Sequence, residues 1–438
     1  MQLDAVIFGG GAAGLWLLDE LTRRGFDVLL IEATALGHGQ TVASQGIIHG
    51  GLKYTLAGLL TPAAKQIREM PNVWRSCLAG EATPDLSRTH VRSHFCHLWR
   101  TDSISSRLGM IGASLGLSVA PRSIDETECP QILAGCPGTV SRLDEQVISP
   151  ASFVADLAAQ HYERIVRLDI ARDVEFEVPT AGQVHRLRIQ NPRTGESLTL
   201  SPRHVILTAG SGNAELRARV GLTTPVMQRR PLHMVMLRGD LPQFHGHCVD
   251  GAKTRVTITS DTDAAGRTVW QVGGQIAESG VAWDRSRLIA QAQSELLTVL
   301  PALDLRHVEW GTYRVDRAEG RTASGTRPDS IQILRDGNTI TAWPTKLALA
   351  PMLAREIVET LDVREAQGVG SRFSRRQQSL LDESSTSAAA KNDSRPRRVP
   401  DLLAWHNWPR PAIAMPPWEV AINWCSQTET DAAPARAA

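Results

Sequence analysis

The length, composition and charge of the chain exclude several classes of protein. It has 438 residues, with 47 lysines and arginines against 46 aspartates and glutamates, and a net charge of +1. So small a net charge gives no long-range field to gather nucleic acid or anionic lipid. No apolar run approaches the ~20 residues that span a bilayer, and the N-terminal residues lack the features of a signal peptide. We therefore expect a cytoplasmic globular protein.

The cysteines and histidines show no disulfide or metal-binding pattern. The six cysteines form no CxxC pair, and six in a chain of this length do not make a disulfide framework, so we expect them to be reduced and mostly buried. His94, Cys96 and His97 are close in sequence. They lie in an alternating, strand-like stretch that sends His97 to the face opposite the other two. We therefore expect no metal site.

The first 32 residues predict a β-α-β unit. Residues 5–8 form a short apolar strand, residues 9–14 form a glycine-rich turn, and leucines recur at helical spacing until Gly25. Residues 28–31 are the next apolar strand. Continuous apolar strands joined through a helix are typical of a parallel sheet that is covered on both faces.

Short alternating segments and a few helices follow from about residue 86. The predicted strands cover residues 91–99, 184–190, 197–200, 204–210, 232–237, 255–260 and 269–273. The predicted helices cover residues 151–162, 286–300 and 347–361, and residues 125–137 are loop-like. The fold class that we expect is α/β, with a Rossmann-like parallel sheet and an interleaved antiparallel sheet that forms a substrate domain.

The C-terminal part of the chain has a different composition. Residues 363–399 have few apolar side chains and an arginine surplus, which predicts a flexible linker. Residues 400–438 form an arm in which four tryptophans lie among prolines: Trp405, Trp408, Trp418 and Trp424. We expect this arm to be an extended segment that docks on the body of the protein or on a partner.

The glycine-rich turn carries a dinucleotide-binding pattern. Gly9, Gly11 and Gly14 have the spacing GxGxxG between a strand and a helix, and Glu32 ends the next strand. The glycines allow a tight turn, close approach of a pyrophosphate and close packing of helix on strand, while the amides near Ala12 and Ala13 face the phosphates. Glu32 can accept hydrogen bonds from a ribose. The motif alone leaves FAD and a nicotinamide cofactor both open.

A second motif resembles a family of flavoenzymes. The segment from His49 to Tyr54 reads HGGLKY and resembles the HGGLRY segment of FAD-dependent glycerol-3-phosphate dehydrogenases. The preceding Ser44, Gln45, Gly46, Ile47 and Ile48 are similar to the matching loop of L-2-hydroxyglutarate dehydrogenases. Both belong to the D-amino-acid oxidase superfamily. The resemblance covers roughly residues 1–362 and implies non-covalently bound FAD.

The resemblance also implies where the rest of the cofactor site lies. It adds Ala33 after the ribose-binding Glu32, and Ala209 and Gly210 at the end of a strand beneath the FAD. Thr345, Lys346 and Leu347 resemble the Gly-Gly-Lys stretch that opens the last helix under the flavin ring. Pro344 and Thr345 stand where the family has two glycines, and Lys53 stands where it has an arginine.

A hydride-transfer reaction needs a proton acceptor and a binding site for its substrate. His49 and His233 are the candidate bases, since histidine titrates near neutral pH. Arg314, where the family has an arginine that faces the substrate, and Lys53 are the candidate anion binders. With Lys346 they point to a small anionic substrate.

The sequence therefore predicts an enzyme with a divided FAD-binding domain. The FAD-binding domain takes residues 1–85, 145–215 and 310–362, and the substrate domain takes residues 86–144 and 216–309. The predicted enzyme is an FAD-dependent dehydrogenase or oxidase that takes a hydride from a small anionic hydroxy or amino acid, or from a polyol phosphate. Its electron acceptor would be oxygen, a quinone or a carrier protein. The alternatives are an NAD(P)-dependent dehydrogenase and a non-catalytic flavoprotein scaffold whose arm binds a partner.

Overall fold

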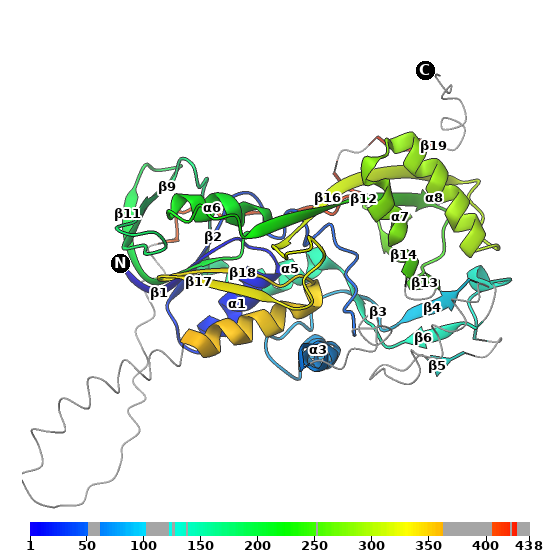
Figure 1. Cartoon of the computed structure of the whole chain (residues 1–438), viewed down its shortest axis with the longest axis horizontal. Helices are drawn as coiled ribbons and strands as arrows, with labels where there is room; N and C mark the ends of the chain where they lie inside the picture. Colours follow the sequence, from blue (N-terminus) through cyan, green and yellow to red (C-terminus); the bar gives the residue numbers. More distant parts are fainter. Residues whose placement is uncertain are drawn as a thin grey trace, which may run out of the picture.

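The described residues form two large β-sheets, with helices packed on their faces, and a small two-stranded sheet (Figure 1). The computed structural model describes residues 1–50, 62–101, 122–124, 128–136, 139–250, 253–361, 405–420 and 423–426. Lys53 and the predicted linker lie outside these residues. Within the described part of the chain, no helix has the length and apolarity needed to cross a membrane.

The first sheet contains the predicted β-α-β unit. Its strands run in the order β17-β18-β11-β1-β2-β8, with β10 and β9 continuing from β11. The bounds are β1 Gln2–Phe8, β2 Val28–Glu32, β8 Ile165–Arg167, β9 Val174–Glu177, β10 Arg186–Gln190, β11 Ser197–Leu207, β17 Gln332–Asp336 and β18 Thr339–Trp343. The pairs β18-β11, β11-β1, β1-β2 and β2-β8 are parallel. Every residue of β2 is buried, as expected for a strand covered on both faces.

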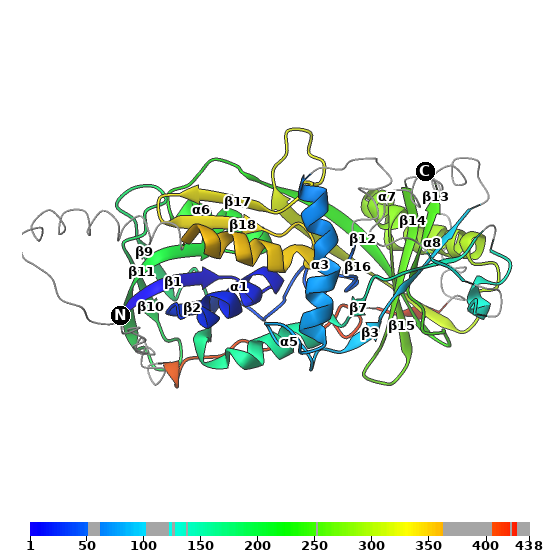
Figure 2. The same cartoon turned by 90° about the horizontal axis from the view of Figure 1, so that it is seen from below.

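Helices cover one face of this sheet (Figure 2). They are α1 Ala12–Arg23, α3 Pro62–Leu78, α5 Pro150–Gln160 and a helix over residues 350–361. Trp16, Trp74 and Phe153 join α1, α3 and α5, and their ring centroids lie 4.7 to 6.1 Å apart. The short helix α6 Asn213–Arg219 follows β11. The helix predicted over residues 347–361 begins with a 3₁₀ turn, η5 Leu347–Leu349, and continues as an α-helix.

The second sheet has nine strands in the order β19-β16-β12-β15-β14-β13-β4-β6-β5. The bounds are β4 Cys96–Arg100, β5 Arg122–Ser123, β6 Ser141–Leu143, β12 Met227–Gly239, β13 Gly246–Asp250, β14 Lys253–Thr262, β15 Thr268–Gly273, β16 Val308–Gly320 and β19 Cys425–Ser426. β3 Val91–Ser93 pairs instead with β7 Val147–Ile148. The helices α7 Gln275–Ser279 and α8 Arg285–Val299 follow β15.

The two faces of the second sheet have different neighbours. Val235, Ile258 and Trp270 point to the face that packs on α8. The opposite face carries Gln271 and Tyr313, whose side chains reach the loop after β2: the hydroxyl of Tyr313 donates to the carbonyl oxygen of Ala43 at 2.8 Å. This second face therefore meets the segment that the sequence assigns to flavin binding.

Two long strands connect the regions of the two sheets. β12 and β16 pair antiparallel over 13 residues each and extend toward the first sheet (Figure 1). Near the end of β16, the backbone amide of Ala318 donates to the side chain of Gln40 at 2.9 Å. Since β16 is hydrogen-bonded into the second sheet, it belongs to that sheet, whereas the sequence assigns residues 310–362 to the FAD-binding domain. The division of the chain into domains stays a prediction.

The C-terminal arm docks on the body of the protein. Trp405 and Trp408 are buried against the first sheet, in a cluster with Phe8 and Leu207. Further along, Trp418 packs on Met236 of the second sheet, and β19 adds to the edge of β16. The arm therefore contacts both sheets. Of the two expected alternatives, docking on the body or on a partner, the structure shows docking on the body.

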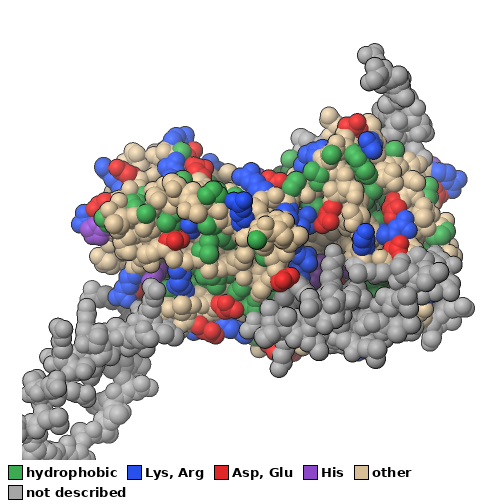
Figure 3. Space-filling view, in the orientation of Figure 1, with side chains coloured by type: hydrophobic (Ala, Val, Ile, Leu, Met, Phe, Trp, Pro, Cys, Tyr) green, Lys and Arg blue, Asp and Glu red, His purple; other side chains and the backbone are tan. Residues whose placement is uncertain are grey.

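The surface has no strong charge asymmetry on the face seen in Figure 3. Basic and acidic side chains are interspersed over the described residues of this face. This distribution agrees with the net charge of +1.

Candidate functional site

The turn after β1 can be made only with glycine at its key positions. Gly9 has φ +104°, and a Cβ there would lie 2.5 Å from the Cα of Ala209. A Cβ on Gly14 would lie 1.9 Å from the carbonyl oxygen of Gly9, so the helix packs directly on the turn. Gly11 has more room, because its Cβ would meet only the hydroxyl of Thr41 at 3.1 Å. The turn therefore has the close backbone approaches that the GxGxxG pattern predicts.

The N-terminus of α1 has free amides for an anion. Gly11 is the N-cap and provides no side-chain cap, and the amide of Ala12 has only a long contact of 3.3 Å with the hydroxyl of Thr41. No acidic side chain lies in the first turn. Backbone amides in this position, with the positive end of the helix dipole, are suited to phosphates.

Glu32 ends β2 beside the same turn. One of its carboxylate oxygens accepts a hydrogen bond from the amide of Gly10 at 2.7 Å, and the other accepts one from the amide of Thr34 at 2.9 Å. Ala33 lies between Glu32 and Thr34 and is exposed. These bonds fix the carboxylate next to the phosphate-binding turn, and its contact with a ribose stays a prediction.

Ala209 and Gly210 follow β11 and lie against the turn. The hydroxyl of Thr208 donates to the carbonyl oxygens of Phe8 and Gly9 at 3.1 Å, and the amide of Ala209 donates to Asn213 at 2.8 Å. The indole of Trp343 donates to the carbonyl oxygen of Gly210 at 3.3 Å. The structure thus brings the predicted Ala-Gly pair together with the glycine-rich turn.

The loop over residues 44–50 is held between the second sheet and β7. Gln45 donates to the carbonyl oxygens of Thr257 and Gln271 of the second sheet, both at 3.0 Å. Gly46 has φ +72°, and a Cβ there would lie 2.0 Å from the carbonyl oxygen of Ile148. The amide of Ile48 donates to Gln146 at 2.8 Å. Tight packing on both sides therefore determines the path of the loop.

A buried carboxylate that the sequence did not reveal lies at the end of this loop. The bridge between Ile47 and Val147 is antiparallel, so it places His49 opposite Glu145, two residues away on each side. One oxygen of Glu145, Oε1, accepts from the amide of Gly50 at 2.9 Å. The other, Oε2, lies 3.4 Å from Nδ1 of His49. Glu145 is 2% exposed, whereas the side chain of His49 is 42% exposed.

A second histidine reaches the same carboxylate oxygen from the second sheet. Nε2 of His247, on β13, lies 3.4 Å from Oε2 of Glu145, and its Nδ1 lies 3.0 Å from the hydroxyl of Thr257. The rings of His49 and His247 are 5.7 Å apart. Donor atoms of the two histidines and Glu145 lie within 4.8 Å of one another, a spacing that a metal ion or shared protons can occupy.

The charges of this cluster influence one another. Burial alone would raise the pKa of Glu145, but His49 and His247 hold it well below its usual range. Desolvation lowers the pKa of His49; Glu145 opposes this shift, and the charges of His247 and Lys346 add to it. The charge of Lys346 thus acts on His49, and its place at the flavin site stays a prediction.

The turn before the last helix departs from ordinary backbone geometry. Thr345 has φ +65°, in the left-handed region that a β-branched residue avoids. Its hydroxyl donates to the carbonyl oxygen of Ser330 at 2.5 Å. Lys346 is the N-cap of η5, and Leu347 is its first residue. Thr345 is thus in the conformation that glycine would adopt without strain.

The structure places His233 and Arg314 elsewhere. They are paired across β12 and β16, and their side chains bond to a segment after α7. His233 lies 3.2 Å from the carbonyl oxygen of Gly280, and Arg314 donates to the carbonyl oxygens of Val281 and Trp283. These contacts do not bring them together with His49 and Glu145. Their predicted roles, like that of Lys53, stay predictions.

Comparison with known proteins identifies the family. The model of the family DAO, FAD dependent oxidoreductase, matches residues 4–359. The chain belongs to this family. The DAO family therefore makes the protein an FAD-dependent oxidoreductase and an enzyme. The nicotinamide-dependent and non-catalytic alternatives are thereby set aside.

Relatives of this DAO-family protein include an enzyme of similar length. It is 36% identical over 435 residues to the probable FAD-dependent oxidoreductase PA4991 of Pseudomonas aeruginosa, covering 96% of this chain and 99% of the relative. The crystal structure of PA4991 matches with a TM-score of 0.73 at 33% identity, over 96% of this chain and 98% of that one.

More distant structures share the fold. Glycine oxidase from Geobacillus kaustophilus matches with a TM-score of 0.60 at 16% identity, over 82% of this chain and 95% of that one. L-α-glycerophosphate oxidase from Mycoplasma pneumoniae, with FAD bound, matches with a TM-score of 0.57 at 13% identity, over 83% and 95%. These two show the common architecture, whereas their substrates differ from one another.

The residues of this DAO-family protein fit the cofactor that the family uses. At Gly9 and Gly14 the backbone packs too closely for any side chain, as in the GxGxxG turns that bind a pyrophosphate. The hydroxyl of Ser44 is buried and has no hydrogen-bond partner among the described residues. A buried polar atom without a partner is destabilising, so a cofactor that supplies the missing bond is a good fit. Together with the free amides of α1, these features are those of an FAD site.

Proposed function

We propose that the protein oxidises a small anionic hydroxy acid, amino acid or polyol phosphate by removing a hydride from the carbon that bears the hydroxyl or amino group. The observation that supports this proposal most strongly is the pairing of His49 with Glu145 at the end of the flavin loop. It is a base with an orienting carboxylate, the arrangement that an alcohol or amine needs when it loses a proton together with a hydride.

The proposed role of His49 follows from the direction of its ring. Nδ1 faces Glu145, so Nε2 is on the other side of the ring, and the side chain is 42% exposed. The carboxylate favours the tautomer with the proton on Nδ1, which leaves the lone pair of Nε2 available for the substrate proton. The lowered pKa of His49 keeps the ring unprotonated at neutral pH. FAD, when bound, supplies the hydride acceptor at its N5 atom.

Lys346 supports the anionic class of substrate. Its positive charge is one of the causes that lower the pKa of His49, the proposed base. A lysine at the N-cap of a helical turn is electrostatically unfavourable, because the dipole is positive there. Negative charge on a substrate or on the reduced cofactor would offset this unfavourable position.

Addition of candidate donors to the holoprotein under anaerobic conditions tests the proposal. The donors are glycerol 3-phosphate, L-2-hydroxyglutarate and a set of small hydroxy and amino acids, each compared with its uncharged analogue. We expect the visible flavin bands to bleach with an anionic donor and not with the analogue. In Lys346→Met, the donor concentration for half-maximal bleaching should rise about tenfold or more, while Lys346→Arg should retain most of the affinity. Bleaching by the uncharged analogues alone would contradict the proposed class.

A further inference from the structure

The segment that leads from Glu32 to the flavin loop pairs with the C-terminal arm. Leu36 and Ile413 form an isolated parallel β-bridge. The amide of Leu36 donates to the carbonyl oxygen of Ala412 at 2.8 Å, and the amide of Ala414 donates to the carbonyl oxygen of Leu36 at 2.9 Å. Both backbone polar groups of Leu36 are therefore hydrogen-bonded to the arm.

Leu36 in turn lies directly against the glycine-rich turn. It is 3% exposed, and a Cβ on Gly10 would lie 2.3 Å from Cδ2 of Leu36. The amide of the next residue, Gly37, donates to the carbonyl oxygen of Gly10 at 2.8 Å. The amide of Gly10 itself donates to the carboxylate of Glu32 at 2.7 Å. The arm is thus connected to the glycine-rich turn through Leu36.

The segment that begins at Leu36 also reaches the two groups that make this region suited to FAD. The hydroxyl of Thr41 accepts a hydrogen bond from the amide of Ala12, at the N-terminus of α1, at 3.3 Å. The carbonyl oxygen of Thr41 accepts from the amide of Ser44 at 3.2 Å. The hydroxyl of Ser44 is the buried group that has no partner among the described residues. Both groups are therefore attached to the segment that the arm holds.

The bridge lies between two attachments of the arm to the body of the protein. Before it, the guanidinium of Arg410 donates to the carbonyl oxygen of Ile165 on β8 of the first sheet. After it, Trp418 is 4% exposed against the second sheet, and Glu419 accepts from the amide of Ala264 at 2.7 Å. Figure 2 shows the arm, orange to red, on this course from the first sheet toward the second. Because the arm is attached on both sides of the bridge, its docking fixes the partner strand of Leu36.

We propose that Leu36 is a positioning residue for FAD and that the docked arm sets its position. The arm holds Leu36 against Gly10, and thereby keeps the turn and the carboxylate of Glu32 in the arrangement that accepts the cofactor. Undocking of the arm exposes two backbone groups of Leu36 to water and releases the turn. Arm docking and FAD binding are therefore coupled, and each favours the other. The inference concerns the cofactor, so it does not depend on which substrate the enzyme oxidises.

Proline substitutions in the full chain separate the bridge from the rest of the arm. Ala414→Pro removes the amide that donates to Leu36, because proline has no backbone N–H. Met415→Pro is the matched control: Met415 is 59% exposed, and its amide has no hydrogen-bond partner among the described residues. In titrations of the apoprotein followed by flavin fluorescence, we expect the dissociation constant of FAD to rise about tenfold in Ala414→Pro and less than about twofold in Met415→Pro. Equal affinities of the two folded variants would overturn the proposal.

A second control separates lost positioning from lost stability. Leu288 on α8 is fully buried in the core beneath the second sheet. Leu288→Ala leaves a cavity there and destabilises the fold, but it does not alter the bridge of the arm. At a temperature at which circular dichroism shows every variant to be folded, we expect its FAD affinity to stay within about twofold of the wild type. A weakening as large as that in Ala414→Pro would overturn the proposal, because stability alone would then explain the loss.

Hydrogen exchange of the wild type tests the coupling without any substitution, and decides the matter even if Ala414→Pro does not fold. By reciprocity, FAD must favour the docked arm if the docked arm favours FAD. Exchange is measured with and without FAD, by mass spectrometry on overlapping peptides. We expect FAD to slow exchange of the amides of Leu36 and Ala414 about tenfold, and that of the amides of α8 less than about twofold. No slowing at Leu36 and Ala414, or equal slowing in α8, would overturn the proposal.

Discussion

The side chain of Gln45 bonds to the backbone of Gln271 across the space between the two sheets. Its amide donates to the carbonyl oxygen of Gln271 at 3.0 Å, and to that of Thr257 at the same distance. Gln45 is thereby fixed to two neighbouring strands of the second sheet, while the following residues of its loop pair with residues 146–148 at β7. The loop that ends at His49 therefore has a definite place between the second sheet and β7.

Replacement of Gln45 should loosen this loop. We expect Gln45→Ala to lower the free energy of unfolding by about 1–3 kcal/mol, because two part-buried carbonyl oxygens lose their donor. FAD should also bind more weakly. Thermal unfolding and FAD titration measure the two effects, and Gln243→Ala, which alters an exposed glutamine with a long 3.5 Å contact, is the control. Equal effects of the two substitutions would show that the contacts of Gln45 do not hold the loop.

Gly46 should tolerate no side chain. Its φ is +72°, and a Cβ would lie 2.0 Å from the carbonyl oxygen of Ile148. We expect Gly46→Ala to destabilise the protein by about 3 kcal/mol or more and to weaken FAD binding, because the backbone of two segments must separate. Gly25→Ala is the matched control, since Gly25 has φ +80° and open space around its Cβ position. The free energy of unfolding of that variant should fall by only ~1–2 kcal/mol, the cost of a residue with a Cβ in the left-handed region.

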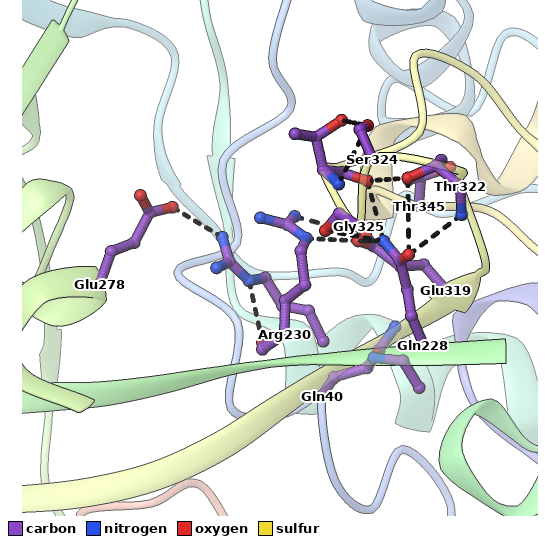
Figure 4. Close-up of polar contacts among 12 residues, drawn as sticks. Gln40, Gln228, Arg230, Glu278, Glu319, Thr322, Ser324, Gly325 and Thr345 are labelled. Atoms are coloured by element: carbon purple, nitrogen blue, oxygen red, sulfur yellow. Dashed lines mark hydrogen bonds and ion pairs between the residues drawn. The ribbon is translucent and has the colours of Figure 1, made fainter. Parts of the chain in front are cut away.

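Thr345 combines strain with a compensating hydrogen bond. It lies beside the loop that carries Thr322, Ser324 and Gly325 (Figure 4), and it donates to Ser330 of the same loop. Thr345→Gly removes left-handed strain of about 1–2 kcal/mol and a hydrogen bond of about 1 kcal/mol, so the unfolding temperature should change little. Thr345→Val keeps the strain and loses the bond, so it should unfold at a lower temperature. The reverse order of the two variants would refute this account.

The arm should contribute to the stability of the whole protein. Trp408 is 1% exposed against the first sheet, whereas Met415, seven residues further along the arm, is 59% exposed. We expect Trp408→Ala to lower the free energy of unfolding by about 3–5 kcal/mol and Met415→Ala by less than about 0.5 kcal/mol. Denaturant unfolding of the holoprotein measures both. A small effect of Trp408→Ala would mean that the arm is dispensable to the fold.

The local part of the fold could be predicted from the sequence. The strand, turn and helix around Gly9 and Gly14 lie within a short stretch, so their pattern is complete without knowledge of the rest of the chain. The motif over residues 44–54 can be recognised for the same reason. Thr345 takes the backbone conformation of the glycine that it replaces, a detail that the resemblance could suggest but not establish.

The partners of His49 could not be predicted in the same way. Glu145 lies between two short strands in a run of three polar residues, and nothing there distinguishes a buried carboxylate from an exposed one. His247 belongs to β13, a strand that the sequence analysis did not predict. Their proximity depends on the antiparallel bridge at Ile47 and on the order of strands in the second sheet.

The orientation of Arg314 shows the same limit. The resemblance predicts that Arg314 faces the substrate, but neighbouring residues of a strand point to opposite faces. The hydroxyl of Tyr313 reaches Ala43 on the flavin loop, while Arg314 reaches Val281 on the other side. Only the register of β16 determines whether Tyr313 or Arg314 faces the flavin loop.

The most direct test of the account is the rate at which a donor reduces the flavin of His49→Asn. Asparagine retains a donor toward Glu145 and removes the base. After anaerobic mixing of the holoprotein with the donor that bleaches the wild type, we predict a rate about 10²–10⁴-fold lower, without the rise with pH that the wild type shows. Reduction of His49→Asn at the wild-type rate, with the same dependence on pH, would contradict the assignment of His49 as the base.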